Sequence, residues 1–274
     1  MIVPLLLAAC GGSSTGSGSS SSSTTTTTTP VTAKASLMHV PVGTATLNWD
    51  PTSKTLMVKV SLTGLAPNSI HPEHIHTGSC AKQGAVLHPL AMLNADAHGN
   101  ATATTTIPNV VGGIPASGWY VNVHNGPGLS PADQFLPIVC GDVNNSNTST
   151  SAAQSVQVTL SSAPAVSTGQ AAMGTAELTL NGSTLTVKVT LSGLAPNSSH
   201  ANHIHLGSCM MQGKVLYPLM TLVADASGNA TATTTITNVS SIPSSGWYVN
   251  VHNSTALTTQ TGFDPIACGD VTVG

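Results

Sequence analysis

Two histidine pairs with the spacing His-x-His have the residue type and spacing that suit metal chemistry. His74 and His76 form one pair, and His203 and His205 form the other. In a β-strand, residues i and i+2 point to the same face, so the two imidazoles of a pair can aim at one point. Two such nitrogens supply half of a metal site, and imidazole suits copper or zinc. We therefore expect a metal centre at each pair.

A third histidine accompanies each pair from a distant part of the chain. His124 and His252 both end the sequence Gly-Trp-Tyr-Val-Asn-Val-His, and we expect each on another strand. The alternative is that these histidines only pack and form hydrogen bonds, which is the better interpretation of any single histidine. That alternative is weaker here because the same set of three occurs twice. His39 and His98 have no counterpart in the second copy, and we expect both in solvent.

Two further histidines precede the pairs by three residues. His71 precedes the first pair, and His200 precedes the second. They are candidates for ligands, or for residues that hold the loop or orient a ligand through a hydrogen bond.

Four of the five cysteines fall into two matching pairs. Cys80 follows His76 by four residues and Cys140 lies near the end of the same repeat, and Cys209 and Cys268 take the same places in the next. An even pair in each domain of an exported chain predicts a disulfide. Such a bond closes about 60 residues, which is worth roughly 4 kcal/mol in the loop-entropy model. The alternative is a zinc site of cysteine and histidine, but the cysteines lack the Cys-x-x-Cys spacing.

The elements that position these residues are repeated along the chain. Residues 62–68 recur as 191–197, and residues 118–125 recur as 246–253. Each repeat is long enough to be a complete domain, so the sequence predicts domains at 31–143 and 155–274 with a polar linker at 144–154.

Each repeat has the pattern of an all-β domain. Apolar residues alternate with mostly polar ones at residues 56–62 and again at 185–191, and residues 101–107 and 230–236 are rich in threonine. Several short strands lie between Gly, Pro and Asn clusters, and no convincing amphipathic helix is present. We expect two tandem antiparallel sandwiches or Greek-key barrels.

The N-terminus resembles that of bacterial lipoproteins. Leu7-Ala8-Ala9-Cys10 follows a short apolar run and resembles the lipobox, in which the cysteine is acylated. This resemblance implies a signal peptide at 1–9, lipidation of Cys10 and a flexible linker at 10–30. The alternative is a fortuitous apolar start with a free cysteine. The apolar run is too short to span a bilayer as a helix.

The charge excludes some partners. The chain has only six lysines and arginines together and a net charge of −3, which leaves nothing to neutralise phosphates. We expect no nucleic-acid partner and no membrane contact beyond a lipid anchor. A protein partner remains unknown.

Several of these motifs resemble known families. Residues 71–76, followed by Gly78-Ser79-Cys80, resemble the copper-ligand segment of copper/zinc superoxide dismutases, and Val139-Cys140-Gly141 resembles their C-terminal disulfide segment. The Tyr-Val-Asn-Val-His strand with His-Ile-His is similar to the CHRD domain. The chain is therefore identified as a tandem CHRD-domain protein with a superoxide-dismutase-like fold. The resemblance implies that both histidine triads bind copper and that Cys80–Cys140 and Cys209–Cys268 are disulfides.

The chain also departs from the dismutases. Only residues 81–93 remain of the long zinc-binding loop, so we expect no zinc. His88 is a candidate for the bridging histidine and a fourth nitrogen, whereas the second repeat has Tyr217 there, so we expect the first site to be tighter. The arginine that attracts superoxide is replaced by Pro137 and Pro265.

Three functions remain open. We favour a cell-surface copper-binding protein without catalysis, extracytoplasmic and lipid-anchored to the membrane. The alternatives are a copper-only superoxide dismutase, which is the only enzyme activity suggested, and a metal-free structural or adhesive module.

Overall fold

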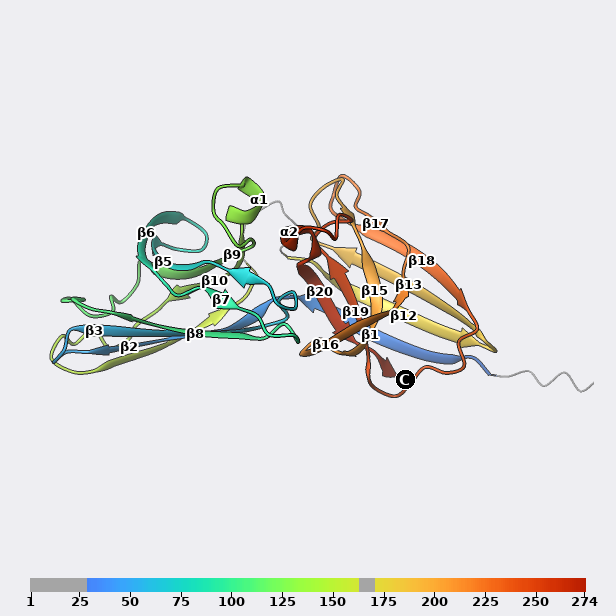
Figure 1. Cartoon of the computed structure of the whole chain (residues 1–274), viewed down its shortest axis with the longest axis horizontal. Coiled ribbons are helices and arrows are strands. Elements are labelled where there is room, and N and C mark those ends of the chain that lie inside the picture. The colour runs from blue at the N-terminus through green and yellow to red at the C-terminus, as the bar shows by residue number, and fades with distance from the viewer. Residues whose placement is uncertain (1–28, 163–170) are drawn as a thin grey trace, which may run out of the picture.

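The computed structural model describes residues 29–162 and 171–274, which form two β-rich units (Figure 1). The predicted signal peptide, Cys10 and most of the predicted linker lie outside the described residues. No helix in the part of the chain that the structure describes is long and apolar enough to cross a membrane.

The first unit is a sandwich of two four-stranded sheets, with orders β11-β2-β3-β8 and β10-β9-β5-β6, and a small sheet of β4 and β7. Its elements are β2 (Val42–Asp50), β3 (Thr55–Thr63), β4 (Ile70–His71), β5 (Glu73–Gly78), β6 (Gln83–Pro89), β7 (Leu93–Asn94), β8 (Ala101–Ile107), β9 (Trp119–His124), α1 (Ala132–Phe135), β10 (Pro137–Val143) and β11 (Gln154–Leu160).

The second unit repeats this arrangement, but its strands are joined into one curled sheet. The sheet order is β16-β15-β19-β20-β1-β12-β13-β18, with β21 paired to β1, and β14 pairs with β17 separately. Its elements are β1 (Val31–His39), β12 (Met173–Asn181), β13 (Thr184–Ser192), β14 (Ser199–His200), β15 (Asn202–Ser208), β16 (Met211–Pro218), β17 (Leu222–Val223), β18 (Ala230–Thr237), β19 (Trp247–His252), α2 (Gln260–Phe263), β20 (Pro265–Asp270) and β21 (Thr272–Val273).

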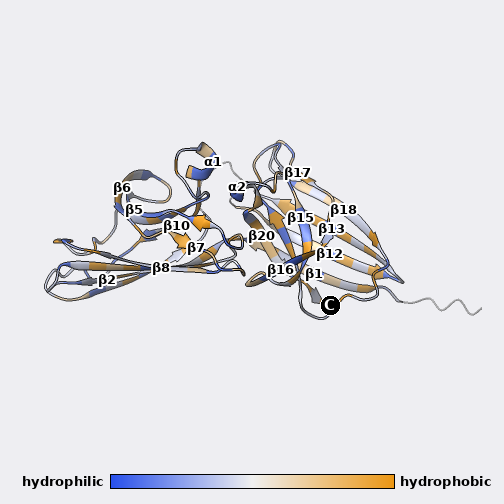
Figure 2. Cartoon of the chain, viewed as in Figure 1, coloured by the Kyte–Doolittle hydropathy of each residue, from blue (hydrophilic) through white to orange (hydrophobic). Residues whose placement is uncertain are grey.

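The alternating sequence pattern builds the core of each unit. In β3, Leu56, Val58 and Val60 are buried, while the residues between them are at least partly exposed. They pack against Ile75 and Val121 of the facing sheet. The alternation of apolar and polar residues along the strands is visible in Figure 2. The all-β prediction is therefore confirmed, and apolar burial between the two faces holds each sandwich together.

The first strand of each repeat lies in the sheet of the other repeat. β1, blue in Figure 1, lies between β12 and β20 of the second unit, and β11 pairs with β2 of the first. Both strands use the same register, because Leu37 lies opposite Gly174 and Leu160 lies opposite Gly43. The folded units thus exchange strands. The domain boundaries 31–143 and 155–274 remain a prediction about the sequence repeats.

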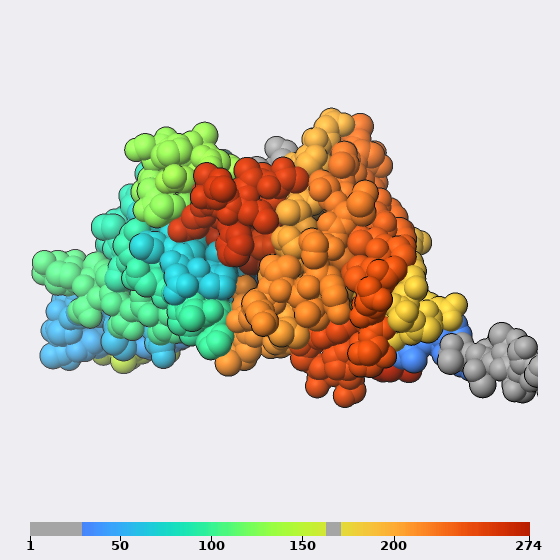
Figure 3. Space-filling view, turned by 45° about the vertical axis from the view of Figure 1, so that its right-hand side comes forward, coloured from blue at the N-terminus to red at the C-terminus, as the bar shows by residue number. Residues whose placement is uncertain are grey.

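The two units also contact each other directly through α2. Gln260 donates its Nε2 to the carbonyl oxygen of Ile70, 2.8 Å away, and Thr261 donates its hydroxyl to Asp133 at 2.7 Å. Figure 3 shows this C-terminal segment, in red, lying against the first unit. Strand exchange and these contacts tie the two repeats into one structure.

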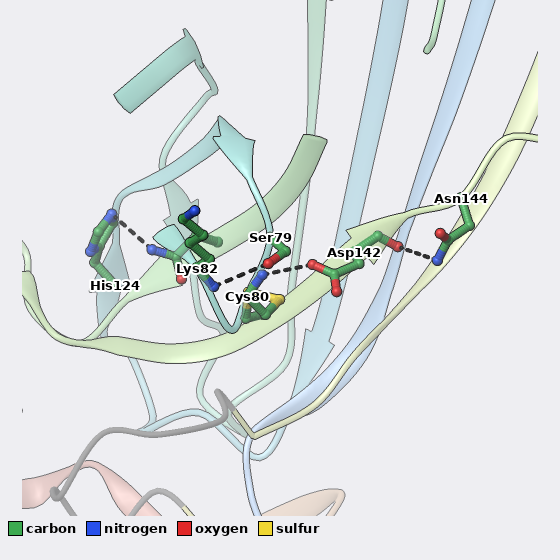
Figure 4. Close-up of a disulfide and its surroundings, with 8 residues drawn as sticks. Ser79, Cys80, Lys82, His124, Asp142 and Asn144 are labelled. Atoms are coloured by element: carbon green, nitrogen blue, oxygen red, sulfur yellow. Dashed lines mark hydrogen bonds between the residues drawn. A yellow bond between two sulfur atoms is a disulfide. The ribbon is translucent and has the colours of Figure 1, made fainter. Parts of the chain in front are cut away.

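Both predicted disulfides are present. Cys80 is bonded to Cys140 and Cys209 to Cys268, with Cα–Cα distances of 5.8 and 5.9 Å. In the first unit, the backbone N–H of Cys80 also donates to Asp142 Oδ1 at 2.7 Å (Figure 4). The disulfides join the segment after the His-x-His strand to β10 in the first unit and to β20 in the second, and the zinc alternative for these cysteines is wrong.

Replacing both Cys80 and Cys140 by serine is expected to lower the free energy of unfolding by about 2–5 kcal/mol, because the bond restricts the unfolded chain over a long loop. Urea unfolding under non-reducing conditions measures this. The matched variant Cys209→Ser/Cys268→Ser should behave similarly. An unchanged unfolding midpoint in either variant would show that the bond adds nothing to stability.

Candidate metal centres

The strand register brings each histidine triad to one face of a sheet. In the first unit, His74 of β5 lies opposite Asn122 of β9, and His76 lies opposite Tyr120. Ile75 and Val121 point to the other face and join the core. His124, two residues after Asn122, therefore shares the face of the His-x-His pair. The same register places His203, His205 and His252 together in the second unit.

The candidate ligand atoms of each triad converge. In each set, one nitrogen from every ring lies within 4.8 Å of the others. In the first unit, Nε2 of His124 is 3.1 Å from Nδ1 of His74. All six imidazoles are buried except that of His203, which is half-buried. Both predicted triads are thus assembled from two strands each.

Backbone carbonyls fix which ring nitrogen is free to bind a metal. Nδ1 of His76 is 3.1 Å from the carbonyl oxygen of Gly84, and Nδ1 of His205 is 2.9 Å from that of Gly213. Nδ1 of His124 and of His252 face the carbonyls of Phe135 and Phe263 in the same way. A carbonyl only accepts hydrogen bonds, so each Nδ1 donates and each Nε2 presents a lone pair.

Several ring nitrogens of the triads have no hydrogen-bond donor beside them in the part of the chain that the structure describes. Among the described residues, Nε2 of His76, His205 and His252 and Nδ1 of His203 are buried without a hydrogen-bond partner. An unsatisfied buried polar group costs about 1–3 kcal/mol. In the first unit, the close contact of His74 with His124 is favourable only with a proton or a cation between the two nitrogens. The donor set therefore fits a metal ion with three imidazole ligands.

Burial also keeps the imidazoles neutral. It lowers the pKa of His74 to about 4, assisted by the charges of His124 and His76, and it lowers the pKa of His252 to about 4. Burial also lowers the pKa values of His76, His124, His203 and His205. A neutral imidazole is the form that binds a metal, so the triads are ready to do so near pH 7.

Aromatic rings hold the histidines in place. Tyr120 stacks on His76 with centroids 4.9 Å apart, and Tyr248 stacks on His205 at 5.0 Å. Phe135, from α1, packs against His124 at 5.0 Å. These rings were not singled out from the sequence. The strand period could have placed Tyr120 beside the triad, because Tyr120 stands four residues before His124 and lies on the same face of the strand.

His71 and His200 support the third histidine of each triad. Nδ1 of His71 donates to the carbonyl oxygen of His124 at 2.9 Å, and His200 makes the same bond to His252. Nε2 of His71 lies 2.7 Å from the hydroxyl of Ser69. With both ring nitrogens engaged, these two histidines orient the backbone of a ligand rather than serve as ligands.

His88 is not brought to the first triad. It lies opposite Ile75, and its ring meets Trp119 edge-on at 5.8 Å. Both neighbours are on the far face of the sheet from His74 and His76. Tyr217 packs against Trp247 in the same way in the second unit. The expectation of a fourth nitrogen from His88 is therefore wrong. Without this nitrogen, there is no reason to expect the first site to bind metal more tightly than the second.

The two unmatched histidines differ from each other. His98 is exposed, as expected. His39 is half-buried at the junction of the units, where its Nε2 lies 3.3 Å from the carbonyl oxygen of Ile138. Burial lowers its pKa to about 4. The expectation of solvent exposure was wrong for His39 because strand exchange carries the end of β1 between the two units.

A buried asparagine stands beside each triad and was not predicted. Nδ2 of Asn122 is 3.5 Å from Nε2 of His124, and both amide atoms of Asn250 lack a hydrogen-bond partner among the described residues. Such an amide can donate to or accept from a small oxygen ligand beside the histidines. Asn122 precedes His124 by two residues, so the strand period was enough to place it on this face.

The buried histidines predict acid sensitivity of the metal-free protein. Four have folded pKa values of about 4: His39, His71, His74 and His252. Below pH 6.5 the unfolded chain binds protons that the folded chain does not, so stability is lost as the pH falls towards 4. The slope is about 1.4 kcal/mol per pH unit for each net proton. Burial raises the pKa of Glu73 to about 8 and raises that of Asp264. These two carboxyl groups make the folded state more stable as the pH falls, but they are fewer than the four histidines. Urea unfolding after chelation at pH 7, 6 and 5 measures this, and a flat profile would contradict it.

Comparison with known proteins agrees with the repeated pattern. A search of curated proteins gave no match. The family model of the CHRD domain matches residues 14–127 and 149–256. The two matched regions contain the two histidine triads and account for most of the chain. The protein therefore belongs to the CHRD domain family and carries two tandem CHRD domains.

Proposed function

We propose that this protein binds one copper ion in each CHRD domain, outside the cytoplasm, and sequesters or carries the metal without catalysis. The observation that carries this proposal is the convergence of three imidazole nitrogens in each triad, several of which are buried without a hydrogen-bond partner among the described residues. Each triad combines rings from two strands that are packed against aromatic side chains. A fixed set of nitrogen donors of this kind binds a metal with little reorganisation.

Copper is the metal best suited to these ligands. Three neutral imidazoles and no carboxylate make up each set. Among first-row divalent ions, Cu(II) binds nitrogen donors most tightly. A second, zinc-binding set next to the copper would need further ligands from β6, but the His88 side chain there lies on the opposite face. The proposal is therefore one copper and no zinc in each domain.

The setting fits a protein held at the cell surface. Disulfides persist in oxidising compartments outside the cytoplasm. We propose that Cys10 is lipidated and that the Ser/Thr/Gly-rich segment after it is a tether. This tether leads directly into β1, so the anchor would be connected to the sheet of the second unit.

Copper titration of untagged protein tests the proposal. Equilibrium dialysis followed by metal analysis should give two copper ions per chain, in sites of similar affinity. His74→Ala/His76→Ala and His203→Ala/His205→Ala should each leave one ion, and together they should leave none. His98→Ala, which changes an exposed histidine outside both triads, should leave two. Copper at background level in the wild-type protein, or two ions in the combined variant, would contradict the proposal.

A further inference from the structure

Three methionines lie close to the place where the chain leaves β1 in the second unit for β2 in the first. Met38 lies opposite Cys268 in the pairing of β1 with β20. Cys268 is bonded to Cys209, and Met210 is the next residue. Since Leu37 lies opposite Gly174, the same antiparallel register sets Met38 beside Met173. Strand pairing and the disulfide together therefore bring the three methionines to one region, where all three line the same cavity.

These three methionines are exposed on the surface. In β1, Ala35 and Leu37 are buried in the core, whereas Met38 is 59% exposed. Met173 and Met210 are 51% and 53% exposed. All three line one cavity of about 420 Å³, and no charged residue is among its described lining residues. The three methionines therefore border a space that a small ligand can enter.

The fold does not require methionine at these places. The corresponding positions of the first folded unit are Ser161, Val42 and Ala81, none of which carries a thioether. The same strands and the same disulfide form there. The three methionines are thus a feature of the second folded unit alone, and the strand pairing and disulfide do not require them.

An imidazole completes the cavity wall. His39 lines the same cavity. Its Nε2 lies 3.3 Å from the carbonyl oxygen of Ile138, and its buried Nδ1 has no hydrogen-bond partner among the described residues. A donor set of three thioethers with one imidazole is soft and uncharged. Soft thioether ligands select Cu(I) over divalent ions.

We propose that Met38, Met173 and Met210, with His39 beside them, form a Cu(I) site at the junction of the two units. This Cu(I) site is additional to the copper sites proposed at the triads and uses none of their residues. Its ligands come from both repeats, so the exchanged strand β1 would be part of the site as well as of the sheet.

Silver(I), which has the same closed shell and does not need a reductant, is the probe for this site. Protein labelled with ¹³C at the methionine methyl groups is titrated with Ag(I) and followed by NMR. The signals of Met38, Met173 and Met210 should shift together and saturate at one equivalent. Met38→Leu/Met173→Leu/Met210→Leu keeps the side-chain volume and should weaken binding at least about tenfold, which is 1.4 kcal/mol. The matched control Met57→Leu/Met92→Leu/Met220→Leu changes exposed methionines elsewhere and should bind as the wild type does.

The same titration on His76→Ala/His205→Ala separates this site from the triads. Retained one-to-one binding of Ag(I) supports the junction site. Binding that vanishes in this variant, that survives the triple leucine change, or that shifts all exposed methionines alike would overturn it. None of these results bears on Cu(II) binding by the triads.

Discussion

Deletion of β1 (residues 31–39) is expected to unfold the second unit, although β1 belongs to the first repeat. The strand fills the gap between β12 and β20 and is the only link between those two halves of the described sheet. Its removal leaves the edges of β12 and β20 unpaired. It also removes Ala35 and Leu37 from the hydrophobic core and exposes the residues that pack against them. The triad of the second unit depends on β19, which pairs with β20, so that triad should be lost while the first is kept.

A single substitution makes the same test without shortening the chain. Leu37→Asp puts a charge into the core of the second unit, which is expected to cost several kcal/mol. The matched change Lys34→Ala alters an exposed residue of the same strand and removes only a surface ion pair with Glu177. Copper binding should fall from two ions to one for Leu37→Asp and stay at two for Lys34→Ala.

The copper ion left in Leu37→Asp should require His74 and His76. A synthetic peptide of residues 31–40, added to the deletion variant, should restore the second ion. If Leu37→Asp instead removed the site formed by His74, His76 and His124, β1 would pair within its own repeat and the strand exchange would be wrong.

The copper-loaded protein is expected to dismutate superoxide far more slowly than the dismutases it resembles. Focused positive charge raises the capture rate of a small anion by roughly 10- to 1,000-fold. Here Pro137 and Pro265, which stand where the sequence resemblance would place an arginine, lie opposite His124 and His252 and are buried. Neither position presents a cation to the site, and the chain carries a net negative charge.

Pulse radiolysis at low and high salt measures this rate. We expect a slow reaction with little salt dependence. The lysine nearest to the His74–His76 pair in the sequence is Lys82, in the loop closed by the Cys80–Cys140 bond (Figure 4). Lys214 lies in the equivalent region of the second unit. A rate near the diffusion limit that falls steeply with salt would contradict the non-catalytic proposal, and Lys82→Ala would then be the first variant to make.

The sequence predicted the parts of the structure that depend on strand period. The alternation at residues 56–62 identified a half-buried strand, and the spacing of His74 and His76 placed both on one face. The position of His88 was not predictable in this way, because the pairing of β5 with β6 shifts register between Ile75 and His76. A bulge changes which face a residue occupies, and period alone does not reveal it.

The strand exchange could not be predicted from the sequence for a different reason. The ends of β1 and β11 present the same pattern, with a leucine that lies opposite a glycine of the neighbouring strand in the same sheet. At Gly43, an added Cβ would lie 2.0 Å from the carbonyl oxygen of Ser61, so this place admits only glycine. Because Leu37 lies opposite Gly174 and Leu160 lies opposite Gly43 in the same way, the local sequence pattern does not decide which unit each strand joins. The likeness to superoxide dismutases remains a resemblance of segments, whereas membership of the CHRD family is shown.

Electron paramagnetic resonance of the Cu(II) protein tests the proposed triads most directly. At two equivalents of Cu(II), the wild-type protein should give two similar centres, each with three nitrogen ligands in the hyperfine pattern. His76→Ala/His205→Ala should reduce this number to two at both centres, while His71→Ala should keep three. Oxygen-only coordination in the wild-type protein, or a spectrum unchanged by His76→Ala/His205→Ala, would show that copper does not bind to the histidine triads.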